Sequence, residues 1–169
     1  WQIANAGYDV ILYEMRPARN TPAHTTPYLA ELVCSNSLKA NNLENASGLL
    51  KEELRRLGSL LMTVADRTRV PAGGALAVDR HLFAQEITDR ISQHPRIQLV
   101  RAEISTIPPA QPAVVASGPL TSPLLSAWLR QLFGEEYFYF YDAVAPIVTR
   151  ESLDPEHIFT ASRYGRGEA

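Results

Sequence analysis

The sequence contains a single cysteine, Cys34, so it forms no internal disulfide. It also lacks a run of about 18 apolar residues, and it lacks a basic segment followed by an apolar one. These absences exclude a recognisable membrane span or secretion leader within the 169 residues. Together with the lone thiol, they predict a soluble cytoplasmic protein with no membrane partner.

An excess of positive charge is also missing. The 16 basic and 18 acidic residues give a formal net charge of −2, so no overall basic field favours nucleic acid, and any RNA contact must come from a local patch. The four histidines, His24, His81, His94 and His157, are scattered without the paired spacing of metal ligands. No metal site is therefore predicted.

The hydrophobic content of 46% is sufficient for one moderate core and the beginning of a second. Trp1–Ala6 is typical of the last turns of a helix that stops at Gly7, so we expect the chain to begin within an element and to lack that element's start. Tyr8–Glu14 alternates like a strand. Three prolines in residues 16 to 30 then predict a long loop.

Apolar residues at helical spacing predict one amphipathic helix after a cap at Asn45; they are Leu50, Leu54, Leu57, Leu61 and Ala65. A short strand at Leu76–Val78 precedes Asp79, which can cap a second helix. That helix carries Phe83, Ile87 and Ile91 on one face and ends near His94.

Two further strands are predicted at Ile97–Ala102 and Ala113–Ala116. A helix should run from its cap at Ser122 to Gly134, and an aromatic strand should follow at Glu136–Tyr141. Strands that alternate with helices indicate an α/β fold with a mainly parallel sheet.

Glu14 is the first candidate binding residue. In a dinucleotide-binding fold, an acidic side chain at the end of the second strand accepts hydrogen bonds from a ribose diol, about 20 residues after the glycine-rich phosphate loop. That loop would lie upstream of Trp1. An ordinary exposed strand end explains Glu14 equally well, and some S-adenosylmethionine enzymes use the same acidic position, so Glu14 does not identify the cofactor.

Ser117 and Gly118 close the segment Val114–Gly118 (VVASG), whose small residues would allow the backbone to approach a bound nucleotide. A core strand followed by a plain turn is the alternative. Cys34 lies in a polar loop, Cys34–Ser37, with Lys39 nearby, where a thiolate would be favoured. A buried, inert thiol is the more common situation for a lone cysteine.

Several longer segments are more specific than any of these patterns. They are Leu12–Pro17 (LYEMRP), Thr21–His24 (TPAH), Ala30–Leu38 (AELVCSNSL), Leu49–Glu53 (LLKEE), Val70–Arg80 (VPAGGALAVDR), Gly118–Ser122 (GPLTS), Phe140–Val148 (FYDAVAPIV) and Ser162–Ala169 (SRYGRGEA). In register along nearly the whole chain, they resemble the folate- and FAD-dependent tRNA (uracil-5-)-methyltransferases.

The resemblance implies an enzyme that uses FAD, reduced by NAD(P)H, to transfer a one-carbon unit from 5,10-methylenetetrahydrofolate to C5 of the T-loop uridine of tRNA, forming 5-methyluridine. Cys34 matches the family's CSNS cysteine and would be the nucleophile that adds to C6 of uracil. Glu14 matches the acid at the FAD ribose. Arg16 would contact the nucleotide half of FAD, and Ser117 with Gly118 would form a second backbone approach.

The family's glycine-rich loop and a second cysteine have no counterpart in this sequence. The resemblance therefore implies a partial Rossmann-like FAD-binding domain at residues 1–120, without the first strand and the glycine-rich loop, and the beginning of an insertion domain at 121–169. We expect such a piece to be inactive alone. Two alternatives stay open: an FAD-dependent enzyme that modifies the wobble uridine of tRNA, and a non-catalytic piece that binds RNA or a partner chain.

Overall fold

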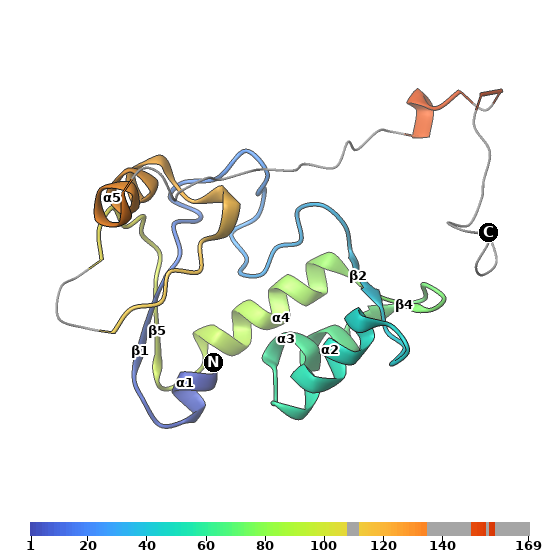
Figure 1. The fold of residues 1–169 in the computed structure, drawn as a ribbon, viewed down its shortest axis with the longest axis horizontal. Helices are drawn as coiled ribbons and strands as arrows, with labels where there is room; N and C mark the ends of the chain where they lie inside the picture. Colours follow the sequence, from blue (N-terminus) through green and yellow to red (C-terminus); the bar gives the residue numbers. More distant parts are fainter. Residues whose placement is uncertain (108–111, 135–149, 155, 158–169) are drawn as a thin grey trace.

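The computed structural model describes residues 1–107, 112–134, 150–154 and 156–157 (Figure 1). In chain order the elements are α1 (Gln2–Asn5), β1 (Val10–Tyr13), β2 (Ser37–Ala40), α2 (Ala46–Arg56), α3 (Leu60–Arg67), β3 (Arg69–Val70), β4 (Ala75–Val78), α4 (Arg80–Ser92), β5 (Ile97–Val100), the short 3-10 helices η1 (Gly118–Leu120) and η3 (Arg150–Ser152), and, between these two, α5 (Pro123–Phe133).

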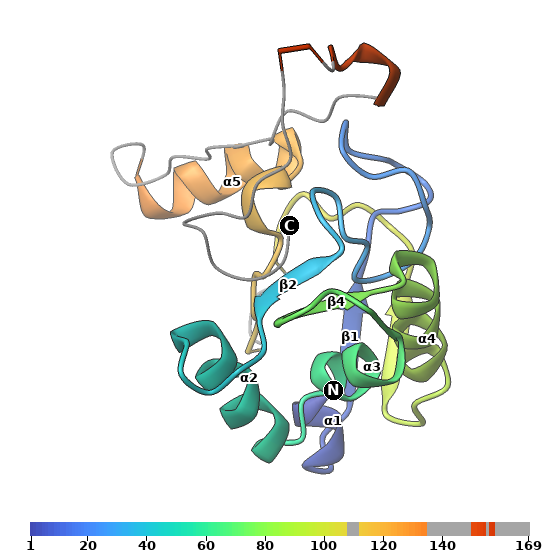
Figure 2. The same ribbon diagram turned by 90° about the vertical axis from the view of Figure 1, so that its right-hand side faces the viewer.

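A parallel pair of strands carries the start of the chain. The helix α1 ends before Gly7, whose φ of +95° turns the chain into β1. Strand β1 pairs with β5 in parallel, with Val10 opposite Ile97 and Tyr13 opposite Val100. Helix α4 packs against β5, as Figures 1 and 2 show. The predicted first helix, first strand and long loop are confirmed, and the α/β class with them.

A second, antiparallel sheet has the order β2-β4-β3. The predicted strand at Leu76–Val78 is its central strand, and Val70 pairs with Ala77 on one side of it. The prediction of a mainly parallel sheet is wrong for the described residues, because β2 and β3 were not foreseen. Both are short: β2 alternates polar and apolar residues over only four positions, and β3 has two residues, so neither gives a clear strand signal.

The predicted helix after Asn45 is in fact two helices. The chain leaves α2 at Leu57, Gly58 adopts a φ of +68°, and the Ser59 hydroxyl accepts from the backbone N–H of Met62 to begin α3. Asn45 begins α2 without a side-chain capping bond. Leu57 is 70% exposed, and Leu50 and Leu61 are 55% and 51% exposed, so these leucines do not form the single buried face that their spacing predicted.

The predicted strand at Ala113–Ala116 is also wrong. These residues are not in a sheet, and Val114 is 82% exposed. A strand requires a hydrogen-bonding neighbour, and in the described part of the chain no strand lies against this segment. The apolar sequence alone therefore does not produce the element.

The two remaining helices follow their sequence signals. The Asp79 carboxylate accepts from the backbone N–H groups of His81 and Leu82 at the start of α4. Ser122 caps α5, Pro123 occupies its first position, and Gly134 ends it with a φ of +85°. Both predictions are confirmed, whereas the aromatic strand predicted at Glu136–Tyr141 lies outside the described residues.

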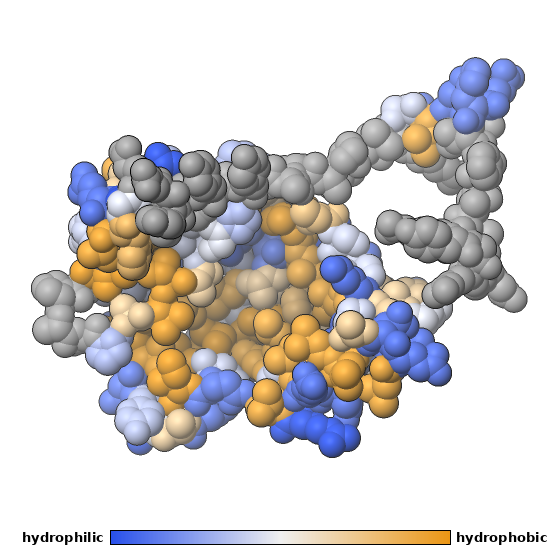
Figure 3. Space-filling view, viewed as in Figure 1, coloured by the Kyte–Doolittle hydropathy of each residue, from blue (hydrophilic) through white to orange (hydrophobic). Residues whose placement is uncertain are grey.

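The hydrophobic core lies where α3, α4 and β4 meet, and its largest fully buried side chains are Val64, Leu76 and Val78. Trp1 and Leu54 pack against it from the edges. Apolar side chains also spread across the face of the molecule shown in Figure 3. Among the described residues, no helix is both long enough and apolar enough to cross a membrane.

Candidate functional site

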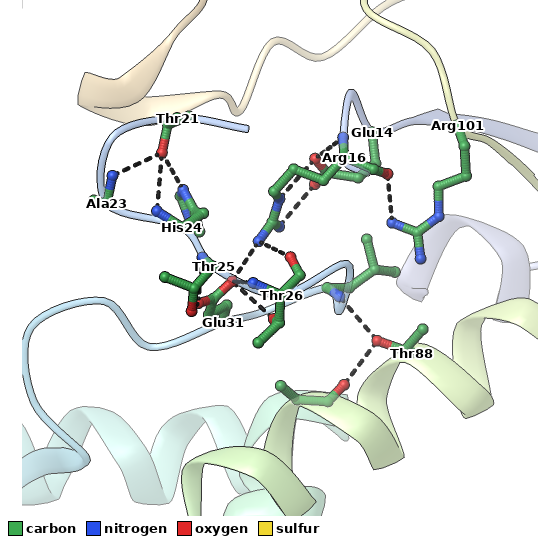
Figure 4. Close-up of polar contacts among 12 residues, drawn as sticks. Glu14, Arg16, Thr21, Ala23, His24, Thr25, Thr26, Glu31, Thr88 and Arg101 are labelled. Atoms are coloured by element: carbon green, nitrogen blue, oxygen red, sulfur yellow. Dashed lines mark hydrogen bonds and ion pairs between the residues drawn. The ribbon is translucent and has the colours of Figure 1, made fainter. Parts of the chain in front are cut away.

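Glu14 lies directly after β1, where the chain enters the long loop. Its carboxylate is hydrogen-bonded to Arg16, two residues further on (Figure 4). Arg16 Nε donates to Glu14 Oε1 at 3.0 Å and Arg16 Nη2 donates to Oε2 at 3.1 Å, and the backbone N–H of Arg16 also donates to Oε1 at 2.9 Å. The fork of the guanidinium thus holds both carboxylate oxygens in a fixed orientation.

Arg16 is only 4% exposed and lies between two carboxylates. Its Nη1 atom donates to Glu31 Oε2 at 2.9 Å, from the far end of the loop. The Arg16 carbonyl accepts from Arg101 Nη1 at 3.1 Å, just beyond β5. Arg16 therefore ties the end of β1, the end of β5 and both ends of the loop together.

Glu31 is the second carboxylate, and it organises the turn before it. Oε1 accepts from the backbone and the hydroxyl of Thr25, and Oε2 accepts from the same two groups of Thr26, all at 2.8 to 3.0 Å. Burial alone would raise the pKa of Glu31, but these hydrogen bonds outweigh it and lower the pKa to about 2. Glu31 is therefore a fixed negative charge at physiological pH.

Glu14 is also held ionised. Burial alone would raise its pKa, but the hydrogen bonds from Arg16 and the charges of Arg16 and Arg101 keep it below its ordinary value. Because Oε1 already accepts two hydrogen bonds and Oε2 only one, Oε2 retains an acceptor position. The carboxylate fits a hydroxyl donor such as one of a ribose diol.

His24 belongs to the same loop and was not singled out as a site residue by its sequence. Its Nδ1 atom lies 2.6 Å from the Thr21 hydroxyl. Burial lowers the pKa of His24, and the positive charge of Arg16 lowers it further, against the opposing pull of Glu31 and Glu14. A neutral imidazole is therefore favoured beside the three charged groups.

Cys34 lies in the loop before β2 and is exposed. Its carbonyl oxygen accepts from Arg80 Nη2 at 3.2 Å. The neighbouring Asn36 is bound on both sides to Val78: the Asn36 amide donates to the Val78 carbonyl, and the Val78 N–H donates to the Asn36 carbonyl. The segments CSNS and VDR, far apart in sequence, thus form one structural unit that presents the thiol.

Helix α4 connects the cysteine loop to the Glu14 loop. Its Arg80 holds Cys34, and the ring of the next residue, His81, makes an edge-to-face contact with Tyr28 at 5.2 Å. About two turns further along the helix, the Thr88 hydroxyl accepts from the backbone N–H of Leu29 at 2.8 Å. Both loops are therefore anchored on the same helix.

Ser117 and Gly118 lie in the turn that leads into α5. The Ser117 hydroxyl lies 2.7 Å from that of Thr121, which donates to the Gly118 carbonyl at 2.7 Å. Gly118 has a φ of +65°, and nothing lies within 4 Å of the position a Cβ would take. The backbone is open there, although the hydrogen bonds of this turn are made within it and not with Glu14 or Cys34.

The structure thus brings Glu14 and Arg16 together, attaches Cys34 to the same supporting helix, and places Ser117 and Gly118 in a separate turn. Sequence reasoning missed Glu31, because a glutamate in a loop carries no motif of its own. The pair Thr25-Thr26 ahead of it was the only available signal. In the described ranges, no three histidine, cysteine or acidic side chains are grouped as a metal site.

Comparison with known proteins places this arrangement in a family. The family model described as glucose inhibited division protein A matches residues 1–169. The chain belongs to this family. Membership of the glucose inhibited division protein A family is consistent with the mixed α/β structure and its parallel β1-β5 pair.

Relatives within the family have a more specific name. Proteins from Desulforudis audaxviator and Brevibacillus brevis, each 60% identical, and from Heliobacterium modesticaldum, 61% identical, are named methylenetetrahydrofolate--tRNA-(uracil-5-)-methyltransferase TrmFO. The matches cover 99 to 100% of this chain and 38% of each relative, so the chain spans well under half of their length. The resemblance seen in the sequence segments is confirmed.

Proposed function

We propose that this chain forms part of a folate-dependent enzyme that methylates C5 of the T-loop uridine of tRNA. The observation that carries the proposal is identity of about 60%, over essentially the whole chain, to relatives named methylenetetrahydrofolate--tRNA-(uracil-5-)-methyltransferase TrmFO. Those names speak against the wobble-uridine alternative and against a purely non-catalytic role for the protein. The chemistry would use FAD, NAD(P)H and 5,10-methylenetetrahydrofolate in the cytoplasm.

Cys34 is proposed as the nucleophile. C5 of uracil reacts poorly with an electrophile until a thiolate adds to C6 and moves electron density onto C5. An exposed Sγ on a loop fixed by Arg80 and Asn36 can meet a base that is turned out of an RNA loop. Once C5 has bonded to the one-carbon unit, loss of the C5 proton and expulsion of the thiolate from C6 would restore the C5=C6 double bond.

Glu14 and Arg16 are proposed to hold the ribose end of FAD, which when bound supplies the reducing equivalents of the transfer. The free acceptor position on Glu14 Oε2 supports this role, because a ribose hydroxyl is a donor of the right kind. Arg16 fixes the carboxylate and has one N–H of Nη2 left for the nucleotide half. The open backbone at Ser117 and Gly118 is proposed as a second place where the chain approaches the bound nucleotide closely.

The same proposal includes the domain division. Residues 1–120 would belong to a Rossmann-like FAD-binding domain whose first strand and glycine-rich loop are not among these residues, and residues 121–169 would begin an insertion domain. The 169 residues alone are expected to be inactive, since the pyrophosphate of FAD would lack its main backbone donors.

The test uses the full-length protein that carries these residues. Its visible absorption spectrum after purification reports bound flavin, and methyl transfer to a T-arm RNA is then followed with methylenetetrahydrofolate and, separately, with S-adenosylmethionine. Cys34→Ala should abolish transfer and leave the flavin spectrum unchanged. Ser35→Ala, on the same loop, serves as the matched control and should retain most of the activity.

A colourless protein, or transfer that depends on S-adenosylmethionine, would overturn the proposed function. Transfer that survives Cys34→Ala would leave the reaction and cofactor in place and assign the nucleophile to another thiol of the full-length protein. Methyl transfer is also measured without NAD(P)H. Transfer that stops in its absence, and resumes when dithionite reduces the flavin, would support NAD(P)H as the physiological reductant.

A further inference from the structure

We propose that Glu31 determines the nucleotide specificity of the site by keeping Arg16 from binding a phosphate. This inference rests on the proposed role of Glu14 at the ribose of the cofactor. An arginine close to the ribose-binding acid is the residue type that accepts a 2′-phosphate in other dinucleotide-binding proteins. Arg16 has the position for that role, two residues after Glu14, but its N–H groups already donate to neighbouring residues.

The hydrogen bonds of Arg16 account for nearly all of its donors. A guanidinium has five N–H groups. Nε and one N–H of Nη2 donate to Glu14, whereas Nη1 donates to Glu31 Oε2 at 2.9 Å and to the Thr26 carbonyl at 3.5 Å. A single N–H on Nη2 is left, so the two-pronged grip on a phosphate that makes arginine effective is blocked.

Glu31 can hold Arg16 in this way because it is itself immobilised. Four donors from Thr25 and Thr26 fix both of its oxygens, and its side chain is 12% exposed. The charges of these groups also disfavour a phosphate. Glu14 and Glu31 balance the charges of Arg16 and Arg101, so no net positive charge is left to attract a phosphate, whereas Glu14 can still accept from a ribose hydroxyl.

The contacts in Figure 4 suggest what removal of Glu31 would do. With Glu31→Gln the side chain keeps its shape and can still accept from Thr25 or Thr26, but the negative charge that holds Arg16 Nη1 is lost. Glu14, Arg16 and Arg101 then carry a net positive charge, and Nη1 becomes available to an incoming anion. A 2′-phosphorylated nucleotide should then be tolerated, although a free diol still binds to Glu14.

The experiment measures displacement of FAD from the full-length protein, followed by recovery of flavin fluorescence, with AMP and with its 2′-phosphorylated analogue as competitors. The two probes differ only in the phosphate at the ribose. In the wild type, AMP should compete at lower concentration, and in Glu31→Gln the preference for AMP should shrink by on the order of tenfold. Glu103→Gln, which removes the carboxylate paired with Arg19, is the matched control and should keep the wild-type ratio.

An effect confined to folding would weaken both probes equally, so an unchanged ratio in Glu31→Gln overturns the inference. In an Arg16→Gln background, Glu31→Gln should no longer alter the ratio; an effect that persists there also overturns it. If Glu31→Gln does not fold, Glu31→Asp, which withdraws the carboxylate from Arg16 by one methylene, provides the same comparison. A wild-type protein without flavin would instead refute the proposed function, and this inference with it.

Discussion

The guanidinium of Arg80 donates through Nη2 to the carbonyl oxygen of Cys34 at 3.2 Å, across 46 positions of sequence. This contact joins the segment VPAGGALAVDR, at its last residue, to the segment CSNS, at its first. Arg80 is the first residue of α4, so the backbone of the cysteine loop is tied to the start of a helix whose other side carries the core residues Phe83 and Ile87.

Arg80→Met should therefore loosen the cysteine loop without removing the thiol. One hydrogen bond on an exposed side chain contributes about 1 kcal/mol, so methyl transfer by the full-length protein should fall about five-fold. Flavin content should not change, because Arg80 does not contact Glu14 or Arg16. The rate of Cys34 alkylation by iodoacetamide should change in the same variant.

Arg90→Met is the matched control for that prediction, since Arg90 lies on the same helix and pairs with Glu86 at 2.8 Å. It should leave both methyl transfer and alkylation close to wild type. An equal loss of activity in the two arginine variants would mean that α4 as a whole was disturbed, and it would remove the special role given to the Arg80 contact.

The low pKa of Glu31 predicts an acid-sensitive contribution to stability. Its pKa is lowered from an ordinary value near 4.5 to about 2 in the folded protein, so the unfolded state binds the proton more readily. The stabilisation is then complete above pH 4.5 and lost as the pH falls toward 2. After allowance for solvent screening it should be on the order of 2 kcal/mol.

Urea unfolding of the wild type and Glu31→Gln from neutral pH down to about pH 3 tests this. The difference in unfolding free energy between the two proteins should narrow as the pH falls below 4.5, because Glu31 takes up a proton in the unfolded wild-type chain while it stays ionised in the folded one. A difference that is independent of pH would show that the Gln variant acts through packing and not through charge.

Local signals were sufficient for the parts of the fold that are determined locally. The start and end of α5 could be read from Ser122 and Gly134, since capping and left-handed glycine turns depend on neighbouring residues only. The helix break at Gly58 was available in the same way and was overridden by a leucine spacing that continued past it. Periodicity cannot show that the helix axis changes between two leucines.

Parts that depend on partners distant in sequence were not accessible. The strand β2 forms because β4 lies beside it, and Ala113–Ala116 is not a strand because no described strand does. Within the candidate site, Glu14 was found because its position follows a strand, whereas Glu31 became recognisable only when the loop closed on Arg16. A loop carboxylate gains its role from tertiary contacts that leave no spacing in the sequence.

Lys51 is a buried lysine whose removal should be costly. It is 6% exposed, and its Nζ donates to the Ala40 and Ser47 carbonyls at 2.9 Å each, which joins α2 to the end of β2. Lys51→Met keeps the aliphatic stem and loses both hydrogen bonds, so it should lower the free energy of unfolding at neutral pH by about 1–2 kcal/mol. Urea unfolding measures this directly.

The pH dependence of the Lys51 effect has a definite sign. Burial, followed by the charges of Arg55 and Lys39, lowers the pKa of Lys51, so the unfolded state binds the proton more tightly. The wild type should gain stability as the pH rises toward 10.5, whereas Lys51→Met lacks this gain and the gap between them should widen. Arg56→Met, an exposed residue of α2, should stay within about 0.5 kcal/mol throughout; a gap that narrows at high pH would contradict the assignment.

Gly48 is required by close packing inside the same helix. A Cβ on this residue would lie 1.9 Å from the Asn42 carbonyl oxygen and 2.6 Å from its carbon, and backbone atoms cannot move aside as a flexible side chain would. Gly48→Ala should therefore force α2 away from the loop that follows β2 and lower the free energy of unfolding by about 3 kcal/mol. The higher helix propensity of alanine, worth about 1 kcal/mol, opposes this loss and is too small to offset it.

Gly74→Ala, where nothing lies within 4 Å of the added Cβ and the φ is not positive, is the matched control and should be nearly neutral. Equal unfolding midpoints in urea for Gly48→Ala and wild type would show that α2 shifts at little cost, and that Lys51 does not hold it against β2.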